Sequence, residues 1–513
     1  MSPLWPTVWY GRMGNDYDYV IAGAGSAGCV LAARLSEDPV VSVLLLEAGP
    51  EDDAPEIRMP AAAPALWTGR YAGDATTVPQ RHAGNRRIFL ATGRALGGGS
   101  AINGMVHLPA LAADYDSWRD EYGCTGWGYD DVLPYVRRAG QMLRPEAGGY
   151  LHSLSAAWLA AAEAYGLPVD GEVVGVGRYR ASRRAGRRWS AADAYLRPAL
   201  HRSNLSVRTD ATATRIVVEH GRAVGVEVAG EVVRARREVV LCAGAIGSPH
   251  LLLVSGVGPA EDLRAHGVDV VVDAPAVGVG LQDHPRCVVQ WATPGVPGLP
   301  EEATPANLEL WRTTGTGPMS SCGAEAGGLV HSRPGAAVPD LQIGVIPGPA
   351  PEPGTAAARR GVAALVTSVQ VRSRGRVALR DADPRTPPDV DPGYLTDPAD
   401  LDVLVAGVLI ARGITACPPL RDLVTAEVAP GVGAATEEAI RAWVRATVGS
   451  MFHPTSTCAM GAGDEAVCDP SLRVRGVAGL RVVDASVMPA ITRANTNAPT
   501  IALAERAADL VRG

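Results

Sequence analysis

Two polar residues near the C-terminus have side chains that could together remove a proton from an alcohol. His453 lies in the run SMFHP, and Asn495 lies in the run RANTNAP. Histidine titrates near neutral pH and can therefore act as a general base. Asparagine does not titrate, but its amide can donate a hydrogen bond to a developing alkoxide. The two residues indicate oxidation of a hydroxyl group, provided that a hydride acceptor binds beside them.

A glycine-rich turn near the N-terminus predicts where such an acceptor binds. The apolar run 17–22 predicts a buried strand, the sequence GAGSAG follows it, and a helical pattern covers 29–35. This strand–turn–helix context is typical of a dinucleotide-binding fingerprint, in which a pyrophosphate lies on the helix N-terminus. The predicted cofactor contacts in this turn are Gly23, Gly25, Ser26, Ala27 and Gly28.

A second predicted strand, 41–46, ends at Glu47 and Ala48. An acidic residue about 20 positions after the fingerprint is placed to accept hydrogen bonds from a ribose. We therefore add both residues to the predicted cofactor contacts. The fingerprint indicates a dinucleotide, but it does not by itself distinguish FAD from NAD.

Three further segments must bring the ends of the chain together around this cofactor. The glycine-rich run 93–105 predicts a loop that approaches a ligand through its backbone. A second strand–glycine–helix unit covers 238–255 and includes Gly244. Near the C-terminus a strand over 480–483 precedes Asp484, and a helix is expected over 499–511 with Pro499 at its first helical position.

Composition limits the class of protein. A chain of 513 residues is too long for one compact core and predicts two domains. The net charge of −7 argues against a nucleic-acid partner, which requires a basic face. The eight cysteines form no C-x-x-C pair, so we expect no metal site.

No apolar run is long enough for a membrane span, and residues 1–15 do not resemble a secretory signal. We therefore expect a cytoplasmic enzyme. The remaining chain is less informative. We expect short antiparallel strands over 205–208, 215–219, 223–228 and 231–236, and a separate strand over 238–241. The arginine-dense stretch 178–188 predicts a solvated surface or a path near the cofactor. Residues 287–441 predict another domain, with Pro/Gly-rich loops over 294–305 and 347–355.

Five blocks of this sequence, in order, resemble the glucose–methanol–choline (GMC) flavoprotein oxidoreductases. The matching blocks are 23–28, 93–105, 244–259, 281–285 and 453–500. The resemblance covers essentially the whole chain and implies a mixed α/β fold with α+β character. Its parts would be a Rossmann-like FAD-binding domain with a parallel sheet and a substrate domain built on an antiparallel sheet flanked by helices. We assign 1–155, 200–286 and 445–513 to the FAD-binding domain, and 156–199 and 287–444 to the substrate domain.

The resemblance also implies roles for individual residues. His453 matches the family's catalytic histidine, and Asn495 matches the second catalytic position. Ile102 stands where some members carry a histidine bonded to the flavin, so non-covalent FAD is expected. The further implied FAD contacts are Gly97, Gly98, Ser100, Asn103, Gly104, Val106, Ala213, Ala243, Gly244, Asp484, Ala485, Asn497, Pro499 and Thr500.

The implied reaction is FAD-dependent oxidation of a primary alcohol to an aldehyde, with further oxidation to an acid as an open alternative. The expected substrate is a polar small molecule such as a sugar, aminosugar or choline-like alcohol, and the electron acceptor is O2 or a quinone or other carrier. A cationic substrate would require carboxylates or an aromatic cage, and Glu301, Glu302, Glu309 and Glu325 are candidates. Two alternatives share the fold: a hydroxynitrile lyase without redox turnover, and a photoenzyme acting on fatty acids, against which the His453/Asn495 pair argues. The sequence does not predict the oligomeric state.

Overall fold

The first two strands form because two apolar runs bury both of their faces. The computed structural model describes residues 14–169, 175–350 and 360–513. In it β1 (Asp16–Ala22) and β2 (Val43–Leu46) pair in parallel, and all but one of their residues are buried. Such continuous burial is typical of parallel strands covered on both sides. Most of the N-terminal segment 1–15 and part of the predicted loop 347–355 lie outside the described residues.

Within the described residues, seven strands form one sheet in the order β10-β2-β1-β13-β12-β11, with β25 paired to β13. The neighbouring pairs along β10, β2, β1, β13 and β25 are parallel, whereas β11, β12 and β13 form an antiparallel meander. The added strands are β10 (Leu205–Arg208), β11 (Ala213–Glu219), β12 (Arg222–Val228), β13 (Glu231–Leu241) and β25 (Leu480–Val482).

Two strand predictions in this sheet were wrong. The strand over 205–208 is parallel, because three of its four residues are buried and it pairs with β2 rather than with the hairpin. The predicted strands 231–236 and 238–241 are one strand, β13. Its first half, in which buried and exposed residues alternate, extends the hairpin, and its buried end lies beside β1.

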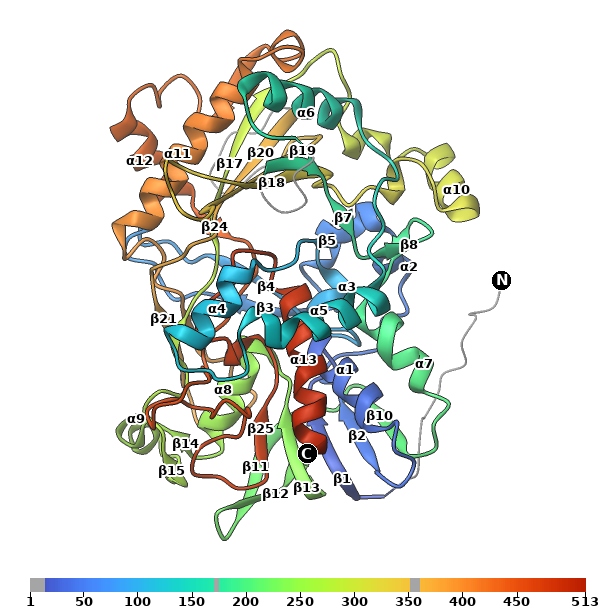
Figure 1. The fold of residues 1–513 in the computed structure, drawn as a ribbon, viewed down its shortest axis with the longest axis vertical. Helices are drawn as coiled ribbons and strands as arrows, with labels where there is room; N and C mark the ends of the chain where they lie inside the picture. Colours follow the sequence, from blue (N-terminus) through green and yellow to red (C-terminus); the bar gives the residue numbers. More distant parts are fainter. Residues whose placement is uncertain (1–13, 170–174, 351–359) are drawn as a thin grey trace.

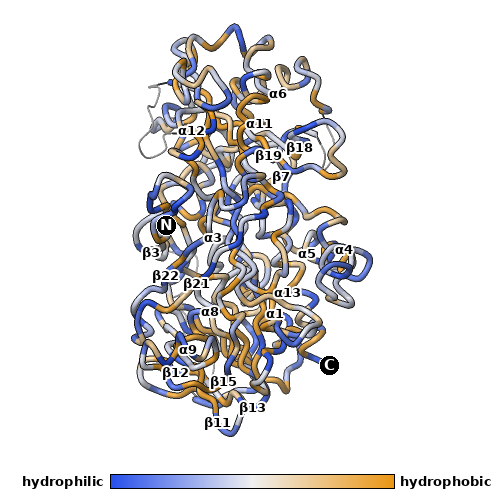
Figure 2. Tube along the Cα trace, turned by 90° about the vertical axis from the view of Figure 1, so that its left-hand side faces the viewer, coloured by the Kyte–Doolittle hydropathy of each residue, from blue (hydrophilic) through white to orange (hydrophobic). Residues whose placement is uncertain are grey.

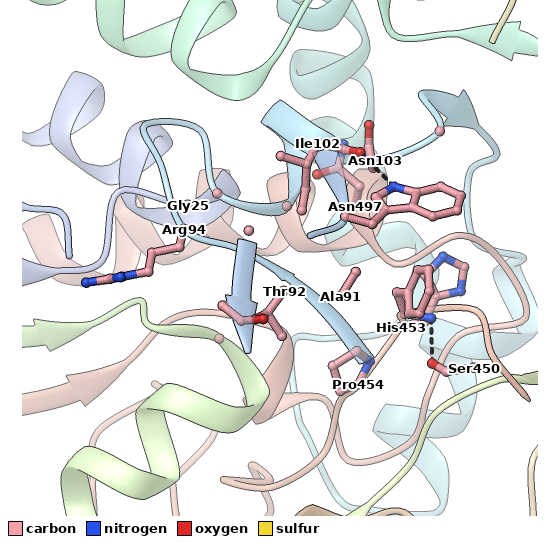
Figure 3. Close-up of a pocket in the computed structure, with 18 of the residues that line it drawn as sticks. Gly25, Ala91, Thr92, Arg94, Ile102, Asn103, Ser450, His453, Pro454 and Asn497 are labelled. Carbon is pink, nitrogen blue, oxygen red and sulfur yellow. Dashed lines mark hydrogen bonds between the residues drawn. The ribbon is translucent and has the colours of Figure 1, made fainter. Parts of the chain in front are cut away.

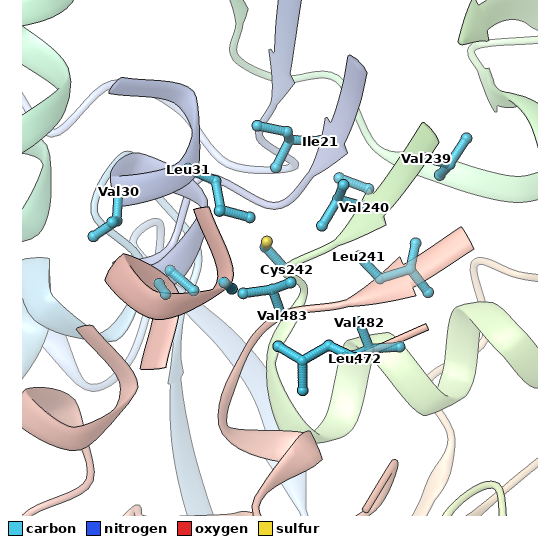
Figure 4. Packing of buried hydrophobic residues seen from close by; sticks show 14 of the residues in the cluster. Ile21, Val30, Leu31, Val239, Val240, Leu241, Cys242, Leu472, Val482 and Val483 are labelled. Carbon is cyan, nitrogen blue, oxygen red and sulfur yellow. The ribbon is translucent and has the colours of Figure 1, made fainter. Parts of the chain in front are cut away.

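Helices from both ends of the chain cover this sheet (Figure 1). α1 (Ser26–Leu35) packs against α13 (Asn497–Arg512), and α13 packs against α5 (Tyr129–Leu143). Figure 4 shows the core they enclose, in which side chains of β1, α1, β13 and β25 meet. Figure 2 shows hydrophobic residues along α1 and α13. The first and last segments are thus one structural unit.

The C-terminal helix starts two residues before the predicted position. α13 begins at Asn497, so Pro499 is its third residue and not its first. The first four N–H groups of a helix have no partner within the helix, so a proline at this position sacrifices no hydrogen bond. The chain therefore enters the helix earlier than the proline suggested.

A second sheet of the described residues is antiparallel and has the order β18-β19-β20-β17-β23, with β24 paired to β17. α11 packs on β20 and also contacts α6 and α12 at the far end of the molecule (Figure 1). The strands are β17 (Pro285–Ala292), β18 (Ala326–Val330), β19 (Leu341–Ile346), β20 (Gly361–Ser368), β23 (Ala426–Ala429) and β24 (Gly449–Ser450). The helices are α6 (Ser153–Tyr165), α11 (Pro398–Thr415) and α12 (Glu437–Thr447).

The two predicted domains meet along β17. The boundary predicted between residues 286 and 287 falls inside this strand. β24 lies in the segment 445–513 assigned to the FAD-binding domain, yet it pairs with β17. This pairing delivers the segment that carries His453 to the junction of the two sheets. The domain limits themselves remain predictions.

The other elements are short and surround these two sheets. The helices are α2 (Pro55–Arg58), α3 (Gly99–Ile102), α4 (Ala112–Asp120), α7 (Arg197–Ala199), α8 (Gly244–Val254), α9 (Ala260–Ala265) and α10 (Pro305–Thr314). The strands are β3 (Ala72–Thr76), β4 (Phe89–Gly93), β5 (Val106–His107), β6 (Gly175–Arg178), β7 (Arg180–Ala181), β8 (Arg183–Arg184), β9 (Arg187–Arg188), β14 (Val257–Gly258), β15 (Val272–Asp273), β16 (Val279–Leu281), β21 (Gly375–Ala378) and β22 (Asp389–Asp391). Among the described residues, no helix combines the length and the apolar character that a membrane span requires.

Candidate active site

One cavity of about 1400 Å³ extends from the turn after β1 to the loop that carries His453. Figure 3 shows residues from both ends of the chain and from the glycine-rich block around it, including Gly25, Asn103, His453 and Asn497. Both predicted catalytic residues line the cavity. The predicted cofactor contacts that line it are Gly23, Gly25, Ser26, Ala27, Glu47, Ala48, Gly98, Asn103, Gly104, Val106, Ala213, Ala243, Gly244, Asp484, Ala485, Asn497 and Thr500.

Four predicted contacts, Gly28, Gly97, Ser100 and Pro499, are not among the lining residues. Gly28 packs α1 against the turn, because a Cβ at this position would lie 1.9 Å from the carbonyl oxygen of Gly23. The hydroxyl of Ser100 donates to the carbonyl of Gly97 at 2.6 Å, which braces the glycine-rich loop. Pro499 is buried in the first turn of α13. The structure thus places these four residues in the wall behind the cavity surface.

The two glycine-rich segments touch each other. The N–H of Gly97 donates to the carbonyl of Ala24 at 2.8 Å. Gly98 has φ +51°, and a Cβ there would lie 2.6 Å from Cα of Gly25. Only glycine fits this close approach without strain. The fingerprint and the block 93–105 therefore form one backbone-lined surface.

This surface suits the diphosphate and ribose of a dinucleotide. Gly25 is the N-cap of α1 and provides no side-chain acceptor, so the first N–H groups of the helix are available to an anion. The carboxylate of Glu47 accepts the N–H groups of Ala24 at 2.9 Å and Gly49 at 2.8 Å, which fixes its position beside the turn. Burial raises the pKa of Glu47 to about 7, and the two N–H donors oppose that rise.

The last helix is tied directly to the first. The hydroxyl of Ser26 donates to the side-chain oxygen of Asn497 at 2.6 Å, so the N-termini of α1 and α13 meet at the cavity. Asp484 is buried and accepts the N–H of Gly244 at 2.9 Å, which holds the start of α8 to the C-terminal segment. Both helix N-termini would favour negative charge on a ligand between them.

Part of the arginine-dense stretch is not solvated. Arg183 and Arg188 are buried, whereas Arg178 and Arg180 are exposed. Arg188 donates to the side-chain oxygen of Asn103 at 2.8 Å, directly behind the cavity wall. The prediction of a surface was wrong for the two buried arginines, because Arg183 donates to the backbone carbonyl of Ser320 and Arg188 to that of Ile57.

The loop that carries His453 is held by Asp283. One oxygen of this buried carboxylate accepts the backbone N–H of His453 at 2.7 Å, and the other accepts the hydroxyls of Ser450 and Tyr394. Ser450 in turn accepts the N–H of Phe452 at 2.7 Å. Phe452 has φ +62°, a conformation that bulky residues rarely adopt, so this network holds a strained turn in place.

The imidazole of His453 lies between two polar side chains. Its Nδ1 is 2.9 Å from Nδ1 of His284, and its Nε2 is 3.4 Å from Nδ2 of Asn495. The side-chain oxygen of Asn495 lies 3.4 Å from Nε2 of Gln342 on β19. Burial lowers the pKa of His453 to about 4, so the ring is neutral at pH 7 and able to accept a proton. The structure thus brings together the two residues that sequence predicted as a pair.

An aromatic wall lies beside His453. The chain has only two phenylalanines, Phe89 and Phe452, and both line the cavity with Trp67. The ring centroids of Trp67 and Phe452 are 5.4 Å apart, and those of Phe89 and Phe452 are 5.8 Å apart, both edge to face. Apolar side chains of the second sheet, Val288 and Leu365, also line the cavity.

Sequence reasoning missed several residues of this site. Asp283, His284 and Gln342 bond to the catalytic loop or its partners but were given no role. The block that contains Asp283 and His284 contributes to the sequence analysis only through its resemblance to the family. The aromatic residues Trp67 and Phe89 carried no local signal. Glu301, Glu302, Glu309 and Glu325, the candidates for binding a cation, are not among the described lining residues.

Family models of GMC oxidoreductases match residues 17–286 and 371–504. The chain belongs to the GMC oxidoreductase family. Human mitochondrial choline dehydrogenase is 39% identical over 538 residues, covering 97% of this chain and 90% of the relative. The "alcohol dehydrogenase [acceptor]" of Pseudomonas putida is 36% identical, with 96% and 95% covered. An uncharacterized GMC-type oxidoreductase of Mycobacterium tuberculosis is 40% identical, with 98% and 100% covered.

Solved structures agree with this assignment. A pyridoxine 4-oxidase from "Mesorbium loti" superposes with a TM-score of 0.86 at 30% identity, covering 96% of this chain and 98% of that one. A fungal aryl-alcohol oxidase superposes with a TM-score of 0.83 at 25% identity, with 97% and 99% covered. The predicted mixed α/β fold is therefore confirmed, and the protein is a GMC-type FAD-dependent alcohol oxidoreductase.

The cavity fits FAD, the family's cofactor. Its glycine-lined end has free helix N–H groups and a fixed carboxylate, and it continues to a pair of proton-handling side chains. This arrangement matches a diphosphate and ribose at one end and a reactive ring at the other. Bound FAD would be held by the cavity-lining residues within 23–27 and 98–106 and by the start of α13.

Proposed function

We propose that this protein oxidises a primary alcohol to the corresponding aldehyde, with His453 as the base that receives the hydroxyl proton. The observation that carries the proposal is the His453/Asn495 pair, which lines the same cavity as the dinucleotide turn. FAD supplies the hydride acceptor when bound. The chain's own residues supply proton removal and stabilisation of the oxygen.

The geometry divides the work between the two side chains. Nε2 of neutral His453 takes the hydroxyl proton, and the amide of Asn495 donates to the oxygen as its negative charge develops. Asp283 and the turn at Phe452 hold the imidazole, so the base loses little freedom when substrate binds.

The cavity lining favours a substrate with an aromatic or otherwise apolar body. Trp67, Phe89 and Phe452 offer aromatic surface beside the base. Among the described lining residues the carboxylates are Glu47 and Asp484, and both belong to the predicted FAD contacts. The choline-like and sugar substrates expected from the sequence remain predictions, and the panel of alcohols described next tests them.

A panel of primary alcohols without oxygen tests this proposal. Aryl, alkyl, sugar and quaternary ammonium alcohols of similar size are mixed with the holoenzyme, and bleaching of the oxidised-flavin band is followed. The proposal expects aryl or alkyl alcohols to bleach the flavin fastest. Faster bleaching by the quaternary ammonium alcohol would reject the substrate class while retaining the reaction, and product analysis would show whether oxidation continues to an acid.

The electron acceptor is either O2 or a quinone-type carrier, and admission of air to the reduced enzyme distinguishes the two. Rapid return of the flavin band identifies an oxidase. Reduced flavin that persists in air and is reoxidised by added quinone identifies a dehydrogenase. The relatives named for choline and alcohol oxidation include both an "oxygen-dependent choline dehydrogenase" and an acceptor-dependent enzyme.

The dependence on pH follows from the lowered pKa of His453. Because the ring must be neutral to accept a proton, reduction of the flavin is expected to stay constant from about pH 8 to about pH 6 and to fall on approach to about pH 4. Stopped-flow reduction under limiting alcohol, measured against pH, checks this expectation. A loss of activity already centred at or above pH 7 would contradict it.

We also propose that FAD is bound without a covalent link. Ile102 is buried in α3 and lines the cavity at the position where a linking histidine was considered, and an alkyl side chain cannot form that bond. Acid precipitation of the holoenzyme should therefore leave the yellow flavin in the supernatant. Flavin that remains with the precipitated protein would show a covalent link at some other residue.

A further inference from the structure

His284 lies against the proposed base, His453, and takes no direct part in the proposed reaction. It follows Asp283 at the start of β17, is completely buried, and lies on the side of His453 away from Asn495. Its ring meets that of His453 nearly at a right angle, with 5.2 Å between ring centroids. Burial and the neighbouring imidazole lower the pKa of His284 well below its usual value, so both rings are neutral at pH 7.

The contact between the rings restricts where their protons lie. Nδ1 of one ring is 2.9 Å from Nδ1 of the other, and two neutral imidazoles can share one hydrogen bond only if one nitrogen donates and the other accepts. Each neutral ring carries its single proton on Nδ1 or on Nε2. The pair therefore has two self-consistent states, which differ in the ring that donates.

The surroundings of His284 are compatible with the state in which its Nδ1 accepts. Backbone groups of Thr492 and Val369 partly oppose the lowering of its pKa. Nε2 of His284 completes no hydrogen bond among the described residues, so no neighbour blocks a proton on that nitrogen. With its proton on Nε2, His284 presents a bare Nδ1 to His453.

The surroundings of His453 point to the same state. Gln342 directs its amide N–H groups at the hydroxyl of Tyr179 and at the side-chain oxygen of Asn495. Asn495 then turns its own N–H group toward Nε2 of His453, which must be unprotonated to accept it. If Nε2 of His453 were protonated instead, the side-chain amides of Gln342 and Asn495 would both have to rotate so that their oxygen and nitrogen atoms exchanged places.

We propose that His284 is a positioning residue that keeps the proton of His453 on Nδ1, so that Nε2 is free to receive the substrate proton. The effect of His284 on the reaction rests on the proposed function, but the positions of the ring protons can be measured independently of it. In the reaction the alcohol O–H bond breaks and its proton moves to Nε2. The carbinol C–H bond also breaks, and its hydrogen leaves with the electron pair as a hydride that FAD would accept. The C=O bond of the aldehyde forms at the same carbon. His453 becomes an imidazolium that still donates its Nδ1–H to His284.

Nitrogen NMR of the holoenzyme tests the assignment directly. Protein labelled with ¹⁵N-histidine is studied at pH 7, and the rings are assigned by the signals lost in His284→Asn and His453→Gln. The proposal expects a protonated Nδ1 and bare Nε2 for His453, and the opposite arrangement for His284. A protonated Nε2 on His453 in the wild-type holoenzyme overturns the proposal, whether or not any alcohol reduces the flavin.

Two variants of His284 with side chains of similar shape test whether this residue affects the rate of flavin reduction. His284→Asn retains an oxygen acceptor near the position of Nδ1, whereas His284→Leu has the same branching and no acceptor. We expect His284→Asn to preserve the His453 proton on Nδ1 and to reduce flavin within about tenfold of wild type, and His284→Leu to shift the proton and slow reduction by about 10²-fold. Equal rates and equal His453 spectra in the two variants, both with FAD bound, reject the positioning role. If His284→Leu does not fold, the wild-type and His284→Asn spectra still decide the proton position.

Discussion

Replacing His453 with alanine is expected to slow reduction of bound FAD by an alcohol by about 10²–10⁴-fold, the usual contribution of a positioned general base. The reason is geometric. His453 lies at the end of the cavity opposite the glycine-lined turn, and its ring contacts His284 and Asn495. FAD content should therefore stay near that of the wild type. Stopped-flow reduction without oxygen and the flavin-to-protein absorbance ratio measure the two quantities.

His201→Ala is the matched control, because His201 is exposed and lies outside the cavity. It should reduce FAD at the wild-type rate. A His453→Ala enzyme that holds FAD and reduces it at an undiminished rate would remove His453 as the base. Loss of FAD from His453→Ala would instead show that this residue supports the cofactor, and the less disruptive His453→Gln would then be needed to measure the rate.

Replacing Gly28 with alanine is expected to yield protein with little or no FAD and a markedly lower melting temperature. A Cβ at Gly28 would lie 1.9 Å from the carbonyl oxygen of Gly23 and 3.0 Å from its carbonyl carbon, and these backbone atoms cannot move aside without opening the turn. α1 would then shift from the dinucleotide-binding turn that its N-terminus serves. Flavin content after purification and thermal unfolding measure the effect.

Gly140→Ala provides the control for a helical glycine. Gly140 lies inside α5, and a Cβ there would meet nothing within 4 Å. Alanine should leave FAD binding unchanged and stabilise the protein by up to about 1 kcal/mol, because it reduces the entropy lost when the helix forms. FAD bound normally by Gly28→Ala would show that the contact between α1 and the turn is looser than the structure has it.

The parts of the site that sequence could predict are those with a local pattern. The strand, the glycine turn, the following helix and Glu47 occur within about 30 residues, so periodicity and spacing suffice to place them. The resemblance to GMC oxidoreductases identified His453 and Asn495 as a pair, and the structure brings them within 3.4 Å.

The parts that sequence could not predict depend on contacts between distant segments. His284 and His453 are 169 positions apart, and Gln342 and Asn495 are 153 apart, so no local pattern relates them. Arginine side chains usually lie on the surface, yet that of Arg188 is buried against Asn103. The start of α13 was misplaced because proline is most common at a helix's first position, but the third position, which Pro499 occupies, also needs no N–H group within the helix.

The most direct test of the central claim is one titration of the purified holoenzyme with the best alcohol of the panel in the absence of oxygen. The oxidised-flavin band should disappear with one equivalent of alcohol per flavin, and the corresponding aldehyde should appear in equal amount. An FAD-loaded, folded enzyme whose flavin band no alcohol changes would show that the protein does not oxidise alcohols. Release of an aldehyde from a cyanohydrin with the flavin still oxidised would identify the lyase alternative in its place.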